Sequence, residues 1–120
     1  MMNMKNLRYN NMCLRALVFL CLLMASVSAW AQTYVFITNE TNGYFIGLSN
    51  GNAVATQTFA TGSCVWTASG TLNNTNNRTL RINTYYLDGA ASNSGTVSIG
   101  NNRNGYWRGN NNQLYYYRNA

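Results

Sequence analysis

Histidine is absent from this 120-residue chain, and only 8% of its residues are charged. The only acids are Glu40 and Asp88. Without an imidazole, a Ser or Cys nucleophile lacks its usual general base, and glycoside hydrolysis needs two carboxyl groups that converge. Glu40 and Asp88 both stand in predicted turns, and nothing in the sequence brings them together. We therefore expect no enzymatic activity.

Cysteine is also scarce, which excludes an ordinary zinc site. Beyond Cys13 and Cys21 near the start, the chain has only Cys64. One thiol, two carboxylates and no imidazole cannot provide zinc ligands, and no glycine-rich phosphate loop is present. The sequence predicts no metal and no cofactor. Cys64, beside Val65 and Trp66, is expected to be a buried free thiol, and an intermolecular disulfide is the alternative.

Residues 1–31 have the features of a secretory signal peptide. An uncharged apolar run spans Ala16–Met24, and Ala29-Trp30-Ala31 has the small-x-small pattern of a cleavage site. Basic residues come before the run: Lys5, Arg8 and Arg15. We expect a helical leader that is cleaved before Gln32. No stable membrane span is expected afterwards, because the run is shorter than the roughly 20 residues that cross a bilayer. An uncleaved anchor is the alternative, and the exported protein would be secreted, periplasmic or on the cell surface.

Residues 32–120 are then expected to form one domain. Its five basic residues are all arginine and its acids number two, which gives a net charge of +3. The arginines are scattered rather than gathered into a stripe, so no nucleic-acid partner is expected.

An aromatic spacing is repeated within this domain. The interval along the chain from Phe45 to Trp66 is the same as the interval from Tyr86 to Trp107. The second pair therefore follows the first at a fixed period, and a period of roughly 40 residues usually marks one supersecondary unit that is copied and packed against its neighbour. The sequence predicts about two repeats.

Short apolar runs between Asn- and Gly-rich clusters predict strands and turns rather than helices. Asn42-Gly43 and Ser49–Asn52 are expected hairpin turns. Alternation of apolar and polar residues over Thr79–Leu87 predicts one half-buried strand, and Cys64–Thr67 is a second expected strand. The predicted fold is all-β, as a small antiparallel barrel or a partial β-trefoil-like module.

At these residues the chain resembles the β-trefoil of ricin-type lectins, whose units have about 40 residues and four strands. Leu87-Asp88 is similar to the Leu-Asp that opens a sugar site in those units, and each block closes on a tryptophan. The residues two before the tryptophans, Cys64 and Gly105, differ from the glutamine of that family. The chain also resembles repeat modules of bacterial surface proteins in its Tyr-Leu blocks, Asn/Gly turns and Trp-Thr strand.

Aromatic rings and short polar side chains favour a binding role. Aromatic rings stack on flat apolar faces and donate hydrogen bonds at their tips, and amides and hydroxyls suit sugar hydroxyls. In the candidate ligand-binding site, Asp88 is the acceptor and Tyr106 or Trp107 is the platform. The rim of this site carries Asn101, Asn102 and Asn104. Asp88 and the asparagines are also ordinary turn residues, which is the alternative interpretation.

We expect a non-catalytic module that binds a carbohydrate or another extracellular ligand, so its partner would be a glycan or an extracellular protein. Two alternatives stay open. One is a structural or adhesive surface protein that self-associates through the C-terminal strand Leu114–Tyr117. The other is a fragment of a longer repeat protein.

Overall fold

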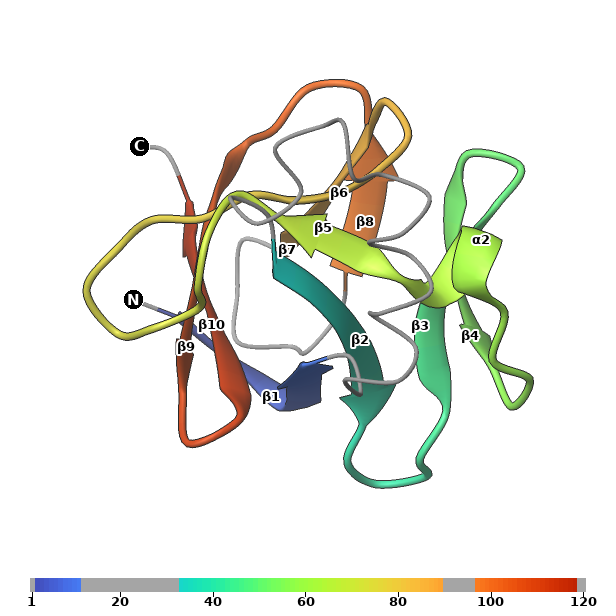
Figure 1. Cartoon of the computed structure of the whole chain (residues 1–120), viewed down its shortest axis with the longest axis horizontal. Helices are drawn as coiled ribbons and strands as arrows, with labels where there is room; N and C mark the ends of the chain where they lie inside the picture. The colour runs from blue at the N-terminus through green and yellow to red at the C-terminus, as the bar shows by residue number, and fades with distance from the viewer. Residues whose placement is uncertain (1, 12–32, 90–96, 119–120) are drawn as a thin grey trace.

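The described part of the chain consists of strands and one short helix. The computed structural model describes residues 2–11, 33–89 and 97–118 (Figure 1). Helix α2 spans Thr61–Cys64. The strands are β1 (Met2–Asn11), β2 (Thr33–Asn39), β3 (Phe45–Ser49), β4 (Asn52–Thr56), β5 (Trp66–Ala68), β6 (Leu80–Ile82), β7 (Tyr85–Gly89), β8 (Val97–Gly100), β9 (Gly105–Asn110) and β10 (Gln113–Arg118). The predicted all-β fold class is confirmed.

All the strands belong to one antiparallel sheet, ordered β8-β7-β6-β5-β2-β1-β10-β9, with the β3–β4 hairpin attached to β2. The ladder does not close into a full barrel. One isolated bridge, Arg78↔Trp107, nevertheless brings β9 back beside the chain that leads into β6. Its two backbone hydrogen bonds have N···O distances of 2.9 and 2.7 Å. The sheet therefore curls around one core, which is compatible with the predicted barrel-like module.

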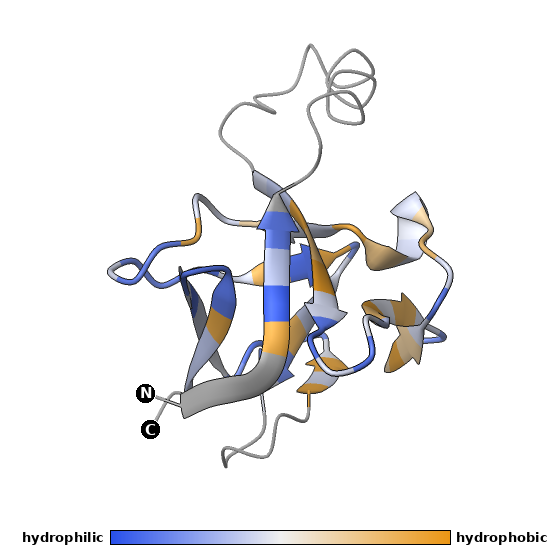
Figure 2. Ribbon diagram, turned by 90° about the horizontal axis from the view of Figure 1, so that it is seen from below, coloured by the Kyte–Doolittle hydropathy of each residue, from blue (hydrophilic) through white to orange (hydrophobic). Residues whose placement is uncertain are grey.

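The core forms where the inward-facing residues of the curled sheet meet. Apolar residues recur between polar ones along the strands, as the colours in Figure 2 show. In β1, Leu7 and Tyr9 are buried and Arg8 between them is partly exposed. Such alternation lets one face of a strand pack while the other meets water. The largest fully buried side chains are Trp66, Trp107, Tyr116, Ile37, Leu80, Leu87, Leu114 and Val35.

The two tryptophans occupy equivalent places in this core, as the repeated spacing predicted. The Trp66 indole N–H donates to the carbonyl of Ile46 at 2.9 Å, and the Trp107 indole N–H donates to that of Leu87 at 2.7 Å. The two donors are separated by one repeat period, the two acceptors are separated by the same period, and both indoles are fully buried. The duplication is thus a repeated packing arrangement as well as a repeated spacing.

Asparagines and glycines form the tight turns between strands. Asn50 and Gly51 have φ of 51° and 75° between β3 and β4, and Asn111 and Asn112 have φ of 52° and 62° between β9 and β10. Positive φ at both central residues is what a two-residue type I′ hairpin requires. The predicted turn at Ser49–Asn52 is confirmed.

Two predicted strands are wrong in their boundaries. The expected single strand Thr79–Leu87 is a hairpin of β6 and β7, because Asn83 takes a positive φ of 53° and reverses the chain. Asparagine tolerates this conformation better than most residues. The expected strand Cys64–Thr67 begins only at Trp66, since Cys64 ends α2. Cys64 itself is a buried free thiol, as predicted.

Residues 2–11, which we expected to belong to a helical leader, form strand β1 between β2 and β10. The physical reason lies in an alternation that the leader pattern hides, because Leu7 and Tyr9 are buried and Arg8 between them is partly exposed. Burial also raises the pKa of the Tyr9 phenol above its ordinary value. The apolar run and the cleavage pattern lie in residues 12–32, outside the described residues.

With β1 in place, strand β10 is not a free edge of the sheet, which the expected self-association through this strand requires. It pairs with β9 over Gln113–Arg118 and with β1 on its other side. Leu114 and Tyr116, within the proposed contact segment Leu114–Tyr117, are fully buried. Among the described residues, no helix is long and apolar enough to span a lipid bilayer.

The equivalence of the two indoles predicts equal effects of their removal. Trp66→Phe and Trp107→Phe each leave a buried carbonyl without its donor and a small cavity, which together cost about 2–4 kcal/mol of unfolding free energy. Urea denaturation of both variants measures this loss. Val54→Thr is the control, since Val54 is 36% exposed, and a surface change of this kind shifts stability by about 0.5 kcal/mol or less. A neutral result for either tryptophan would contradict the packing repeat.

Candidate ligand-binding site

Asp88 is buried rather than exposed at the surface. Its side chain is only 2% exposed. Both carboxylate oxygens lie 3.1 Å from the backbone nitrogen of Asn104, and the Tyr116 hydroxyl donates to Oδ1 at 3.3 Å. A buried carboxylate is tolerated when hydrogen bonds replace its water. Asp88 therefore holds the loop before β9, and its burial does not support the predicted role as a sugar acceptor.

The first repeat has different residues at the positions equivalent to Asp88 and Asn104. Gly47 and Ser63 stand one repeat period before Asp88 and Asn104. A Cβ built on Gly47 would lie 2.8 Å from the Ser63 carbonyl oxygen and 3.2 Å from Cys64 Sγ. The absence of a side chain at Gly47 thus lets α2 pack directly on β3. In the second repeat, Asp88 stands at the position equivalent to Gly47, and its carboxylate accepts hydrogen bonds from the backbone of the loop before β9.

Trp107 is not a stacking platform. Its indole is fully buried, and its ring centroid lies 5.0 Å from that of Tyr116 at an interplanar angle of 55°. Tyr106 is half-buried, and the Arg103 guanidinium lies over its ring at 4.6 Å. Alternation along β9 explains the difference, because Gly105, Trp107 and Gly109 face inward. Of the two predicted platforms, only Tyr106 reaches the surface.

The predicted rim residues Asn101, Asn102 and Asn104 are exposed. The structure joins Asn104 to Asp88 through its backbone and through a side-chain contact of 3.5 Å. No described contact ties Asn101 or Asn102 to Asp88. The six predicted residues therefore do not form one pocket: Asp88 and Trp107 are structural, and Tyr106 and the asparagines are surface groups beside them.

A groove of about 280 Å³ lies elsewhere, over the outer face of β5, β6 and β7. Its lining residues are Thr67, Ala68, Ser69, Thr79, Arg81 and Tyr86. Strand pairing builds it, because Thr67 lies opposite Arg81 and Arg81 lies opposite Tyr86. Leu80 and Ile82, on either side of Arg81, are buried. Their burial directs the Arg81 side chain to the outer face.

The groove combines hydroxyl groups, one aromatic ring and one guanidinium, and none of its lining residues is acidic. Arg81 is exposed and has no side-chain hydrogen bond or ion pair with any described residue. Other arginines are already engaged within the fold. Arg78 Nε donates to the Thr71 carbonyl at 3.0 Å, and Arg108 Nε donates to Asn77 Oδ1 at 2.9 Å. Arg81 is therefore available to an anionic group from outside.

Sequence reasoning missed this groove. The available signal was the alternation Leu80-Arg81-Ile82, which places the guanidinium on the outer face. The pairing that brings Thr67 and Tyr86 to either side of Arg81 follows from the hairpin at Asn83, which the alternation over Thr79–Leu87 does not reveal.

Catalytic and metal chemistry have few suitable groups in the described part of the chain. No group of three or more His, Cys, Asp or Glu side chains comes together there. Glu40 forms an ion pair with Arg8 at 3.2 Å, and Asp88 is buried and hydrogen-bonded.

Comparison with known proteins adds no assignment. No family model matches the chain, and no curated protein or solved structure shows significant similarity to it.

The structural role of Asp88 is directly testable. Asp88→Ala removes the acceptor for the Asn104 N–H and the Tyr116 hydroxyl, which should cost about 2–4 kcal/mol of unfolding free energy. Glu40→Gln is the matched control, because breaking an exposed ion pair costs about 0–1 kcal/mol. Urea denaturation compares the two variants. An Asp88→Ala variant as stable as the wild type would contradict the structural role.

Proposed function

We propose that this protein is a non-catalytic binding module for extracellular carbohydrate, and that the groove over β5–β7 is its binding site. The observation that carries this proposal is the unpaired guanidinium of Arg81, placed between the half-buried ring of Tyr86 and the hydroxyl of Thr67. Aromatic rings pack against the apolar face of a sugar, and hydroxyl groups exchange hydrogen bonds with its edge. The groove is at the small end of the range for ligand sites, which suits one sugar unit of a longer chain.

The charge of the groove favours an acidic sugar. Arginine presents a planar fork of donors that matches a carboxylate or sulfate group. No acidic side chain lines the groove, so nothing in it repels such a group. A uronate or a sulfated sugar therefore suits the site better than a neutral one.

An extracytoplasmic location is part of the same proposal. Its support is the order of basic residues, apolar run and small-x-small pattern in residues 1–31. Secreted, periplasmic and surface-bound proteins all meet glycans and other extracellular partners, and a fold without an evident catalytic centre suits recognition.

A self-associating or adhesive protein is the second candidate function, and one surface feature favours it. Phe36, Phe45 and Phe59 form an edge-to-face cluster with ring centroids 5.2–5.9 Å apart. Phe59 is 38% exposed, and Val54 on β4 is 36% exposed. Exposed apolar clusters often mark contact surfaces, so this aromatic cluster would bind a second copy or another apolar surface.

Glycan binding by the full chain distinguishes the two functions. Arg81→Gln should weaken binding to acidic glycans about 10-fold or more, because a charged hydrogen bond contributes about 1.5–3 kcal/mol. Binding should also weaken with salt, because Arg81 is exposed and salt screens its charge. The control is Phe59→Ser, which leaves the groove intact and should bind as the wild type does.

A glycan array followed by calorimetry measures these affinities. Wild-type affinity in Arg81→Gln would contradict the groove as the site. Absence of any glycan binding, together with concentration-dependent sedimentation that Phe59→Ser abolishes, would favour the adhesive function instead.

A further inference from the structure

Strand β1 occupies a position in the sheet like those of β5 and β9, but it lies outside the two repeats. Strand β5 lies between β2 and β6, and β9 lies between β10 and the chain at Arg78. Each of these two strands carries a buried tryptophan. Strand β1 lies in the third such place, between β10 and β2, and has Leu7 and Tyr9 as its buried side chains.

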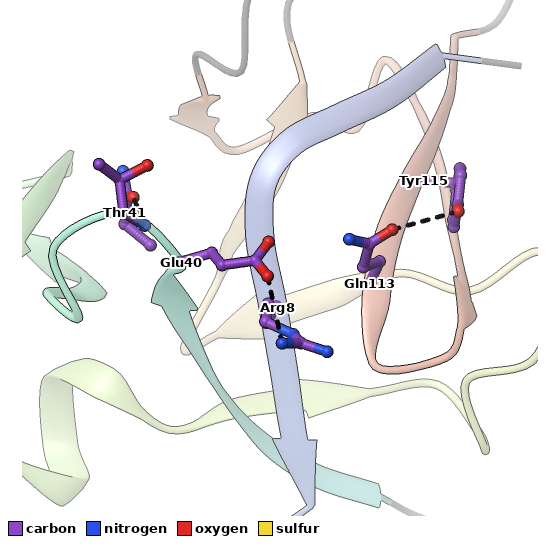
Figure 3. A network of polar contacts seen from close by, with 6 residues as sticks. Arg8, Glu40, Thr41, Gln113 and Tyr115 are labelled. Carbon is purple, nitrogen blue, oxygen red and sulfur yellow. Dashed lines mark hydrogen bonds and ion pairs between the residues drawn. The ribbon is translucent and has the colours of Figure 1, made fainter.

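The fit of β1 depends on a small set of contacts. Leu7 and Tyr9 are 2% and 8% exposed. A Cβ on Gly109 would lie 2.5 Å from the Tyr9 ring, so only a glycine there leaves room for an aromatic side chain. On the outer face, Arg8 forms its ion pair with Glu40 at 3.2 Å (Figure 3). The position thus accepts an apolar residue, a basic residue and an aromatic residue in succession.

The pairing of β1 with its two neighbours is uneven. It pairs with β2 without interruption from Leu7↔Asn39 to Asn11↔Val35. Its register with β10 shifts between Asn3 and Arg8, where β1 bends away from the β9–β10 hairpin in Figure 3. Pairing with β2 covers residues 7–11, and pairing with β10 involves Met2, Asn3 and Arg8. A strand whose pairing is incomplete on both sides is held by fewer main-chain hydrogen bonds, which makes it easier to displace.

Removal of residues 1–31, which the leader pattern predicts, would take β1 away. Strands β2 and β10 would then be two facing edges with unpaired N–H and C=O groups. The buried side chains of Val35, Ile37, Leu114 and Tyr116 would lose the strand that lies between them. Exposed edges of this kind bind added strands.

We propose that the space between β2 and β10 is a strand-acceptor site. In the uncleaved chain residues 2–11 occupy it, and in the processed chain an extended segment of another polypeptide takes their place. The partner segment has the pattern apolar–basic–aromatic, as in Leu7-Arg8-Tyr9. Its apolar and aromatic side chains enter the core, and its basic side chain pairs with Glu40. This inference is independent of sugar binding, because the groove over β5–β7 lies on other strands.

A peptide added in trans tests the site in the full-length chain. The double variant Leu7→Asn/Tyr9→Asn displaces its own β1, and the probe is a fluorescent peptide with the sequence of residues 2–11. By anisotropy, the variant should bind one peptide at least 10-fold more tightly than the wild-type chain, whose site is already filled. The same peptide with both substitutions is the matched control and should bind to neither chain.

Each outcome decides the proposal. A variant that keeps native tryptophan fluorescence but binds the peptide no better than the wild type overturns it, and so does binding that ignores the two substitutions. A variant that unfolds but refolds with the wild-type peptide supports it. If the variant folds neither alone nor with the peptide, the wild-type chain with a protease site inserted in residues 12–32 is tested instead. After cutting, exchange of β1 for the labelled peptide supports the acceptor site, and failure to exchange overturns it.

Discussion

One buried indole group holds two strands together in each repeat. Its N–H donates a hydrogen bond to a main-chain carbonyl twenty residues earlier, which joins β5 to β3 in the first repeat and β9 to β7 in the second. An indole N–H cannot be buried without a partner except at a cost of about 1–3 kcal/mol. The carbonyls of Ile46 and Leu87 therefore fix where β3 and β7 lie against β5 and β9. Trp107 also forms the isolated bridge to Arg78 that brings β9 back toward β6.

The two repeats share this framework but differ in what packs beside it. Gly47 lets α2 approach β3 directly, whereas the Asp88 carboxylate binds the backbone of Asn104. The carboxylate that looks like a sugar ligand is thus a packing element of one repeat. The outer faces differ as well. Arg81 and Tyr86 form a polar groove over β5–β7, and Phe36, Phe45 and Phe59 form an apolar cluster near β2 and β3. Recognition is therefore proposed on the outer face of a duplicated core.

Spacing and turn chemistry in the sequence were enough to predict the fold class, the repeat and the Asn50-Gly51 hairpin, because each depends on local pattern. The candidate site was predicted less well. Whether Asp88 on β7 and Trp107 on β9 face the core or the solvent depends on which segments cover those two strands, and no local pattern contains that information. The break at Asn83 is similar, since asparagine is compatible with a strand exposed on one face and with a reversal of the chain. Strand β1 was missed because its basic residues, placed before an apolar run, gave the stronger signal of a leader, while Leu7 and Tyr9 alternate over only three residues.

Hydrogen exchange of the indole N–H groups, followed by two-dimensional ¹⁵N NMR, tests the duplicated core most directly. The chain has three tryptophans, and Trp66→Phe and Trp107→Phe spectra assign the two signals of interest. Buried, hydrogen-bonded N–H groups exchange only when the structure opens. The account predicts that both Trp66 and Trp107 are protected to a similar degree, each at least about 100-fold slower than a free indole, in line with an opening free energy of about 3 kcal/mol or more. Rapid exchange at either position would contradict it.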